Sequence, residues 1–249
     1  VDNVAGAGTP VLTCGGDNTS TTFSGVAQNT TGTFALTKAG TGTLTLSGAN
    51  SYAGLTTISA GPFQLGTADV IPDASAVTVT GTLDMNTFDE TIGSLAGTGT
   101  VDNVAGGGSP ALTLGGDNSS TTFSGVLQNT TGALTVVKTG SGELTLSGAN
   151  THTGGTTLST GTLNVNSATA LGAAAATFRI GNGTTVDNTS GGAITITNNN
   201  PQTWVGDFTF TGSNNLNLGT GAVTMSSNSN VTISGGTLTV GGTINNNSR

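Results

Sequence analysis

The chain repeats one long module, and this repeat limits the folds open to it. Residues 1–50 recur as residues 101–150 without insertion or deletion, and 36 of the 50 positions are identical. Copies this similar indicate a recent duplication, and we expect a longer parent chain with more of them. Because repeat proteins bury apolar surface by stacking neighbouring units, a repeat architecture is the first fold to test.

The comparison of the chain with itself also predicts how it is divided. Residues 1–100 are expected to form a first β-solenoid module, and residues 101–166 the second copy of that module. Residues 167–249 have diverged from the first module but keep its texture of short apolar runs between Gly and Asn. We therefore expect them to form a continuation of the same solenoid.

Short runs of apolar, Thr, apolar residues predict many short strands. In such a run the apolar pair points to one face, while the β-branched Thr favours extended backbone and points to the other face. The Ala-rich segment 168–176 is too short for a stable helix, and we expect a turn or a single helical turn there. The runs are Leu44-Thr45-Leu46, Val77-Thr78-Val79, Leu144-Thr145-Leu146, Ile194-Thr195-Ile196, Phe208-Thr209-Phe210, Val231-Thr232-Ile233 and Leu238-Thr239-Val240.

The spacing of these runs predicts an all-β fold, a right-handed parallel β-helix (solenoid). Successive strands imply coils of roughly 20 to 25 residues, within the range of repeat architectures. Gly, Asn and Asp are expected at left-handed corners between the strands, and about ten to twelve rungs should stack at about 4.8 Å. Antiparallel β-sandwich modules are the alternative fold that short strands with Gly turns allow.

The composition limits the function. Charged residues make up 6% of the chain, the net charge is −8, and only Lys38, Lys138, Arg179 and Arg249 are cationic. Since nothing is present to neutralise phosphates, no nucleic-acid partner is expected. Aromatic residues make up 4%, and Trp204, Tyr52, His152 and Cys14 are each the single residue of their type. This composition argues against most enzymes.

The single cysteine excludes an intrachain disulfide and a cysteine-based zinc site. Leu114 occupies the position of Cys14 in the second copy. We therefore expect Cys14 to act as a small buried hydrophobic residue rather than as a reactive thiol.

Catalytic candidates are few. A Ser-His-Asp arrangement needs a histidine, and His152 stands where the first copy has Tyr52, so we expect a surface or ladder residue. Polysaccharide-cleaving sites need convergent carboxylates. Asp84, Asp89 and Glu90 lie close together in sequence without a nearby cation, and a solvated acidic loop is the favoured interpretation.

Two further acidic residues are candidate calcium ligands. Asp17 and Asp117 each lie in the sequence Gly-Gly-Asp-Asn, and carboxylate with carbonyl oxygens can bind Ca²⁺. The Gly-Gly-x-Gly-x-Asp repeat of a calcium roll is absent, so Asx turns are expected instead. The sequence thus predicts no catalytic residues, no cofactor and no metal site.

One segment carries a specific resemblance. It reads Leu36-Thr37-Lys38-Ala39-Gly40-Thr41-Gly42-Thr43-Leu44-Thr45-Leu46-Ser47-Gly48-Ala49-Asn50-Ser51-Tyr52-Ala53-Gly54, followed by Thr56, Thr57, Gly61 and Gly66. This pattern resembles the autotransporter-associated β-strand repeat of passenger domains, over residues 20–66 and again over 120–166. Each copy departs once, with Pro62 where Thr162 is typical and His152 where an aromatic residue is typical. The second copy matches at Lys138, Gly140, Gly142, Leu144, Leu146, Gly148, Asn150, Gly154, Gly161 and Leu163.

The resemblance implies a secreted passenger displayed on a bacterial cell surface, usually a β-helical stalk, and implies no chemistry. We therefore expect an extracellular structural or adhesive protein that is not an enzyme. A passenger enzyme acting on glycans is the alternative. Expected partners are the chain itself, by end-to-end axial stacking into filaments, or further repeats of the parent chain, and cell-surface or glycan ligands.

Overall fold

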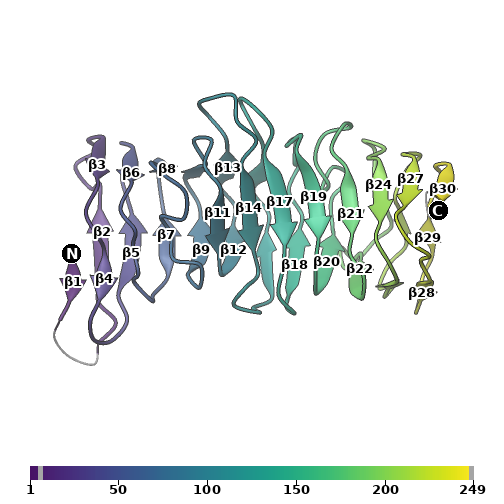
Figure 1. The fold of residues 1–249 in the computed structure, drawn as a ribbon, viewed down its shortest axis with the longest axis horizontal. Helices are drawn as coiled ribbons and strands as arrows, with labels where there is room; N and C mark the ends of the chain where they lie inside the picture. The colour runs from purple at the N-terminus through teal and green to yellow at the C-terminus, as the bar shows by residue number, and fades with distance from the viewer. Residues whose placement is uncertain (5–7, 247–249) are drawn as a thin grey trace.

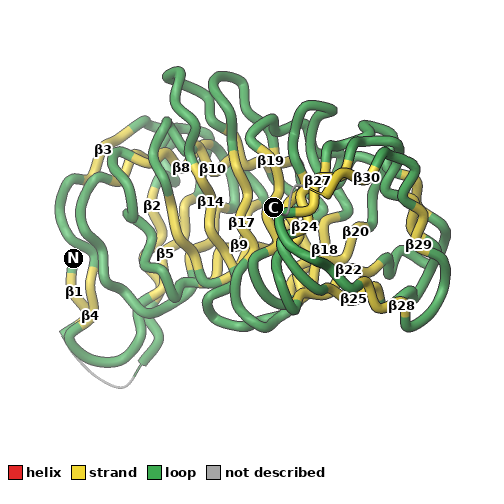
Figure 2. The backbone as a smooth tube through the Cα atoms, turned by 45° about the vertical axis from the view of Figure 1, so that its right-hand side comes forward, coloured by secondary structure: helices red, strands yellow, loops and turns green. Residues whose placement is uncertain are grey.

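The chain forms one elongated stack of short parallel strands. The computed structural model describes residues 1–4 and 8–246, and across these residues it contains strands, turns and loops but no helix (Figures 1 and 2). Among the same residues, no segment forms a helix long and apolar enough to cross a membrane. The N-terminus and the last strand lie at opposite ends of the stack (Figure 1).

Three lines of hydrogen-bonded strands run along the stack, and each coil of the chain passes them in the order I, II, III. Line I is a single sheet of eleven strands. Its members are β2 (Val11–Cys14), β5 (Ala35–Lys38), β7 (Thr56–Ile58), β9 (Ala76–Val79), β12 (Ser94–Gly97), β15 (Thr121–Phe123), β18 (Glu143–Leu146), β20 (Thr162–Val165), β22 (Thr184–Asp187), β25 (Phe208–Phe210) and β28 (Val231–Ile233).

Lines II and III are each divided into two sheets. Line II has β3 (Thr21–Phe23), β6 (Leu44–Leu46), β8 (Pro62–Leu65), β10 (Thr82–Asp84), β13 (Thr100–Asp102) and β16 (Val126–Leu127), then β23 (Ile194–Thr195), β26 (Leu216–Asn217) and β29 (Leu238–Thr239). Line III has β1 (Asp2–Asn3) and β4 (Gln28–Asn29), then β11 (Glu90–Ile92), β14 (Ala111–Leu114), β17 (Thr135–Lys138), β19 (Gly155–Leu158), β21 (Phe178–Ile180), β24 (Gln202–Trp204), β27 (Val223–Met225) and β30 (Ile244–Asn246).

This arrangement confirms the predicted parallel β-solenoid. The strand pairs are parallel, as in the pairing of β2 with β5 and of β25 with β28, so the antiparallel sandwich alternative is wrong. Paired positions on successive coils lie between 18 residues apart, as for Val77 and Leu95, and 26 residues apart, as for Gly97 and Phe123. The eleven strands of line I agree with the expected ten to twelve rungs.

The apolar, Thr, apolar runs form strands because alternate side chains fill the interior. In β9 the side chains of Val77 and Val79 are buried and that of Thr78 is exposed. The same alternation repeats in β6 and β25, and one continuous apolar core results. The Ala-rich segment 168–176 forms consecutive turns, as expected.

Corner residues turn the chain between strands. Asn18 and its copy Asn118 take left-handed backbone, with φ of 61° and 60°, and all but one of the described non-glycine residues with positive φ are Asn or Asp. Gly40 and Gly140 are left-handed as well, and a Cβ at either position would overlap a carbonyl oxygen of the preceding coil. This confirms the expected use of Gly, Asn and Asp at corners.

The sequence repeat and the structural repeat are out of phase. Strand β2 lies in line I, but its copy 100 residues later, β14, lies in line III. Likewise β3 and β6 lie in line II, whereas their copies β15 and β18 lie in line I. From β2 to β12, both in line I, the chain completes four coils. It then passes line II at β13 and reaches line III at β14. One module therefore covers four coils and two thirds of a fifth.

The phase difference also moves the projecting loops around the stack. The loops after β13 and β16, residues 103–110 and 128–134, rise above the body on one side (Figure 1). The copy of the second of them, which follows β4, hangs below the opposite side at the N-terminal end (Figure 1). The same sequence thus projects in two directions.

Replacing an inward leucine by a charged residue tests this core. Leu46 and Leu146 are 2% and 1% exposed. We expect Leu46→Asp or Leu146→Asp to lower the free energy of unfolding by about 3 kcal/mol or more, because each buries an unpaired charge. Thr78→Asp, on an outward position, should change it by less than about 0.5 kcal/mol. Urea unfolding followed by circular dichroism measures this, and wild-type stability of both leucine variants would contradict the inward placement.

Candidate functional site

Asp84 does not face solvent but belongs to a hydrogen-bonded ladder between coils. It is 3% exposed and lies in register with Gln64 on one side and Asp102 on the other. Its Oδ2 accepts a hydrogen bond from Gln64 Nε2 at 2.9 Å, and its Oδ1 accepts one from the backbone N–H of Val104 at 3.1 Å. Both carboxylate oxygens are therefore occupied in holding neighbouring coils together.

Glu90 is buried in the interior. It begins β11 at an inward position and is 1% exposed. Its Oε2 accepts hydrogen bonds from the backbone N–H groups of Val70 at 3.0 Å and Ile71 at 3.4 Å, while the buried Oε1 has no hydrogen-bond partner in the described part of the chain. Burial raises the pKa of this carboxyl from 4.5 to about 8, against the lowering effect of the two N–H donors.

The predicted solvated acidic loop is therefore wrong for two of its three members. Asp84 is buried because it lies in the ladder between coils, and Glu90 is buried because it points into the interior. Of the three acids, only Asp89 is exposed. Asp89 accepts a hydrogen bond from the backbone N–H of Ala111 at 2.8 Å. Each of the three carboxylates holds a different backbone segment, and none shares a partner with another.

His152 lies in the core, in the segment between β18 and β19. It is fully buried, and its Nε2 lies 2.9 Å from Thr156 Oγ1, while its Nδ1 has no hydrogen-bond partner among the described residues. Tyr52 makes the same contact in the first copy, with its hydroxyl 2.7 Å from Thr56 Oγ1. Burial lowers the pKa of His152 from 6.5 to about 4. The expectation of a surface position is therefore wrong, because His152 lies in the core. Among the described residues, no carboxylate orients its imidazole as a catalytic triad requires.

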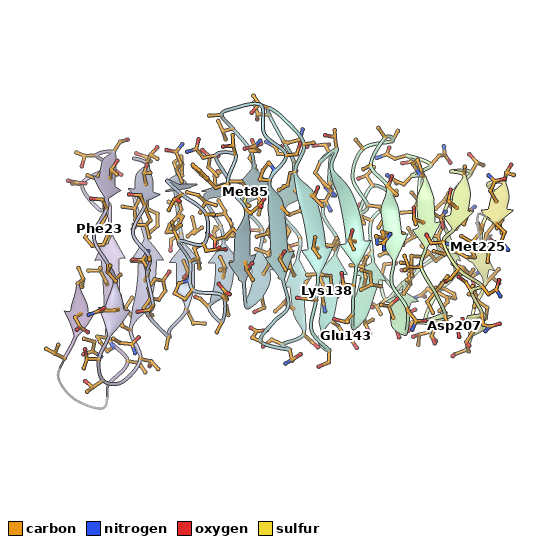
Figure 3. All side chains as sticks on the ribbon, in the orientation of Figure 1. Phe23, Met85, Lys138, Glu143, Asp207 and Met225 are labelled. Atoms are coloured by element: carbon orange, nitrogen blue, oxygen red, sulfur yellow. The ribbon has the colours of Figure 1, made fainter. Side chains whose placement is uncertain are left out.

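Sequence reasoning missed the role of two lysines. Lys38 and Lys138 are each 1% exposed and end strands β5 and β17. The Nζ of Lys38 donates hydrogen bonds to the backbone carbonyls of Ala39, Gly40 and Ala60, at 2.6, 2.9 and 3.1 Å. Lys138 binds the corresponding carbonyls in the middle of the stack (Figure 3). Each ammonium group thus joins two consecutive corners, and burial lowers its pKa.

Two buried asparagines each connect three coils. Asn150 Oδ1 accepts a hydrogen bond from the backbone N–H of Leu127 at 2.9 Å, and its Nδ2 donates to the carbonyl of Ala170 at 2.8 Å. Asn50 makes the equivalent pair of bonds in the first copy. The signal in the sequence is that Ser-Gly-Ala-Asn recurs unchanged in both copies directly after an inward strand.

The Gly-Gly-Asp-Asn sequences form Asx turns, as expected. Asp17 accepts hydrogen bonds from the backbone N–H and the hydroxyl of Thr19, at 3.1 and 2.9 Å, and these bonds lower its pKa. Asp117 accepts one from the backbone N–H of Ser119 at 2.9 Å. Within residues 1–4 and 8–246, no three His, Cys, Asp or Glu side chains are grouped to hold a metal ion.

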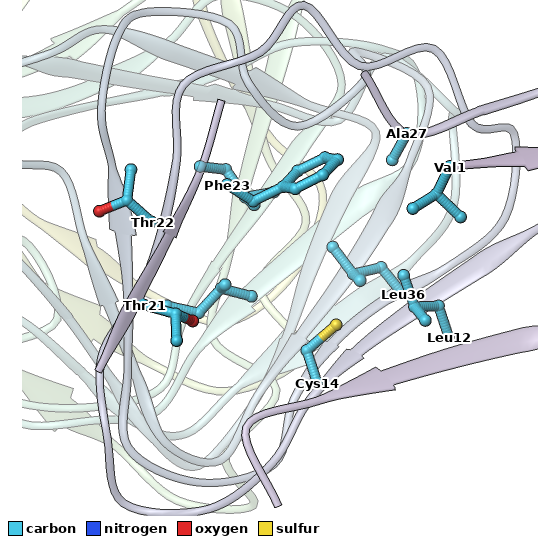
Figure 4. Close-up of a pocket in the computed structure, with 10 residues that line it drawn as sticks. Val1, Leu12, Cys14, Thr21, Thr22, Phe23, Ala27 and Leu36 are labelled. Atoms are coloured by element: carbon cyan, nitrogen blue, oxygen red, sulfur yellow. The ribbon is translucent and has the colours of Figure 1, made fainter. Parts of the chain in front are cut away.

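An apolar hollow of about 340 Å³ opens at the N-terminal end of the stack (Figure 4). Cys14 lines it and is only half-buried, so the expectation of a buried hydrophobic residue is corrected for this end. Leu114, at the same position in the second copy, is 1% exposed because a preceding coil covers it. The other lining residues are Val1, Leu12, Thr21, Thr22, Phe23, Ala27, Leu36, Leu44 and Leu46.

The outer surface carries rows of threonine. Thr13, Thr37, Thr57 and Thr78 lie in register at the outward positions of four successive strands of line I. Thr203 and Thr224 form a similar pair in line III. These rows offer hydroxyl and methyl groups at the spacing of the coils, about 4.8 Å, without charge.

Comparison with known proteins gives two results. Residues 36–65 and 136–165 match the family model described as Passenger-associated-transport-repeat, so the resemblance found in the sequence is confirmed. The adhesin BmaC autotransporter of Brucella suis biovar 1 (strain 1330) is 39% identical over 97 residues. That match covers 36% of this chain and 3% of the relative, so the chain spans a small part of that protein. No solved structure matches the chain significantly.

The buried Glu90 and His152 predict how stability depends on pH. The folded pKa of Glu90, about 8, exceeds its ordinary value of 4.5, so its contribution is present below pH 4.5 and is lost as the pH rises to 8. The folded pKa of His152, about 4, lies below 6.5, so its contribution is present above pH 6.5 and is lost as the pH falls to 4. The two trends offset each other between pH 4.5 and 6.5.

Thermal or urea unfolding between pH 4 and 8.5 tests this. Wild-type stability should fall by about 2 kcal/mol from pH 6.5 to 8. Glu90→Gln should remove that loss and leave the loss from His152 unopposed as the pH falls from 6.5 to 4.5. His152→Tyr, which restores the residue of the first copy, should instead make stability rise over the same interval. Unchanged pH profiles in both variants would contradict the assignment of these two groups.

The asparagine that spans three coils gives a second prediction for this region. Asn150→Ala leaves a buried N–H and a buried carbonyl without partners, and should lower the free energy of unfolding by about 2–4 kcal/mol. Asn228→Ala, at an exposed position, should change it by less than about 0.5 kcal/mol. Urea unfolding of the wild type and of both variants measures these changes. Equal effects of the two substitutions would refute the structural role of Asn150.

Proposed function

We propose that this chain is a section of an adhesive passenger displayed outside a bacterial cell, in which the β-solenoid acts as a stalk with binding surfaces. The observation that carries the proposal is the presence of two passenger-associated transport repeats within one continuous parallel stack. The match to part of an autotransporter adhesin supports the adhesive role.

The physical character of the stack supports work outside the cell. Consecutive coils are joined by backbone ladders and by buried side chains such as Asn150 and Lys138, without any disulfide. Strands that are hydrogen-bonded to both neighbouring coils offer few sites to proteases.

The outer surface supports binding to uncharged polar ligands. Rows of threonine and the projecting loops 103–110 and 128–134 carry hydroxyl, amide and backbone groups and no charged side chain. Such groups hydrogen-bond to neutral glycans of a cell surface. Binding of one ligand by several equivalent rungs would add avidity to weak single contacts.

The position of the acids favours the adhesive role over glycan cleavage. A glycosidase places two carboxyl groups across one bond of the substrate, about 5 to 9.5 Å apart. Here Asp84 and Glu90 are buried in contacts between coils, and Asp89 holds a backbone N–H. The aromatic side chains Tyr52 and Trp204 are buried, so they form no platform for a sugar ring.

Adhesion can be tested with coated beads. Fluorescent beads carrying the folded chain should bind to an epithelial cell monolayer at least fivefold more than beads carrying albumin. Treating the cells with glycosidases should reduce binding, because the ligand is a surface glycan. The variant Asn228→Ala, at an exposed position outside the threonine rows and the two projecting loops, controls for coating. The double variant Leu46→Asp, Leu146→Asp tests whether binding needs the solenoid.

Two outcomes would contradict the proposal. Binding at the level of albumin would argue against adhesion by this section. Release of reducing ends from polysaccharides by the wild-type chain, and its loss in Glu90→Gln, would favour the glycan-acting enzyme instead.

A further inference from the structure

The sequence contains a single Asn-Gly pair, Asn182-Gly183. The pair forms the turn between β21 and β22, and both residues are exposed. In such a pair the backbone nitrogen of the second residue attacks the side-chain amide of the first more readily than in other pairs, because glycine has no side chain to obstruct the approach. Every other asparagine of the sequence precedes a residue that carries a side chain. Asn182 is therefore the asparagine at which the sequence most favours this reaction.

The following coil holds both reacting groups of this turn. The backbone N–H of Gly183 donates a hydrogen bond to the carbonyl oxygen of Asp207 at 2.7 Å. The Oδ1 of Asn182 accepts a hydrogen bond from the backbone N–H of Asp207 at 2.9 Å. The nitrogen of Gly183 becomes a nucleophile only when it loses its proton, and that proton is held by Asp207. The contact with Asp207 therefore restrains the reaction.

Packing fixes the side chain of Asn182 as well. Gly206 is buried, and a Cβ placed there would overlap Oδ1 of Asn182 and would lie 2.8 Å from its Cγ. Gly206 does not take left-handed backbone, so this close contact, and not a turn, requires glycine at the position. The corner of the second coil thus keeps the amide of Asn182 in place beside Asp207.

The two corners also match in length. Ile180 lies in register with Trp204 before the corner, and Thr184 lies in register with Phe208 after it. The corner at 181–183 therefore has the same number of backbone atoms as the corner with which it pairs. Any change that lengthens one of them breaks its match with the other.

We propose that Asn182-Gly183 is a site of spontaneous deamidation, which the contact with Asp207 restrains and which proceeds when this corner opens. The backbone nitrogen of Gly183 forms a bond to Cγ of Asn182, the bond from Cγ to Nδ2 breaks, and the proton of the Gly183 N–H leaves with the departing ammonia. Water then opens the cyclic imide at either of its two carbonyls and gives aspartate or isoaspartate. The reaction needs water and no oxidant, reductant or enzyme.

The products cannot restore the closed corner. In the imide, Gly183 has no N–H to donate to Asp207. Isoaspartate adds one carbon atom to the backbone of a corner whose partner keeps its length. Aspartate places a carboxylate beside the exposed carboxylate of Asp207 on the next coil. Each opening that leads to reaction thus loosens the joint between two coils permanently. This chemistry is independent of the adhesive role, since it uses a corner and no ligand.

The rate of deamidation tests the restraint. The folded chain and a synthetic peptide of residues 178–187 are incubated in the same buffer, and conversion of Asn182 is followed by mass spectrometry of proteolytic fragments. We expect conversion in the folded chain to be at least about tenfold slower than in the peptide, because the reaction waits for the corner to open. This comparison needs no variant.

Two glycine variants locate the restraint. Gly206→Ala places a methyl group against Asn182 and should make conversion in the folded chain at least about fivefold faster than in the wild type. Gly192→Ala is the matched control, because a Cβ there meets nothing within 4 Å and its backbone is not left-handed. It should keep the wild-type rate. Circular dichroism shows that both variants are folded.

The effect on the joint is measured separately. Wild type is held unfolded in guanidinium chloride until Asn182 has reacted, and is then refolded. Gly183→Asn is treated in the same way, because asparagine accepts left-handed backbone but obstructs the attack. The treated wild type should unfold at a lower urea concentration than the untreated wild type, and the treated variant should keep the midpoint of its untreated form.

Three outcomes overturn the proposal. The first is equal conversion of Asn182 in the folded chain and in the peptide, or no conversion in either. The second is a folded Gly206→Ala variant that reacts at the wild-type rate. The third is a wild-type chain fully converted at Asn182 whose unfolding midpoint is unchanged.

Discussion

Each coil of this protein is stable only because it hydrogen-bonds to the coils before and after it. A strand of three or four residues, such as β6 or β9, has no stability of its own, and its backbone groups are satisfied only by strands about 20 residues away in sequence. The apolar core follows from the same contact, because inward residues in register form continuous columns. The buried polar side chains strengthen the contact between coils as well. Asn50 and Lys38 hydrogen-bond to backbone groups of neighbouring coils that apolar side chains could not satisfy.

Local chemistry explains why the strands and corners could be predicted from the sequence. The alternation in Val77-Thr78-Val79 needs only an interior on one side, and left-handed Asn18 and Gly40 need only a sharp corner. The burial of Glu90, Lys38 and Lys138 could not be predicted in this way. Charged residues are usually exposed, and these three are buried with hydrogen bonds to backbone groups of another coil. Their roles become visible only when the register between coils is known.

The candidate site also has features that could be predicted from the sequence and features that could not. The Asx turn at Asp17 follows from nearby residues, and the equivalence of His152 and Tyr52 follows from comparison of the two copies. The hollow at Cys14 does not, because most of its lining residues recur in the second copy, where Leu112, Leu114 and Phe123 are buried. A similar sequence is thus buried at Leu114, where a preceding coil covers it, and half-buried at Cys14.

The phase difference between module and coil has a consequence for a rod made of many such modules. Each module of 100 residues advances by four coils and two thirds of a turn, as the move of β2 in line I to β14 in line III shows. Three modules must follow one another before a given surface returns to its first azimuth. The projecting loops would then wind around the rod as a coarse screw and point in three directions. A rod of this kind would present the same contact to its surroundings in whatever orientation it lay.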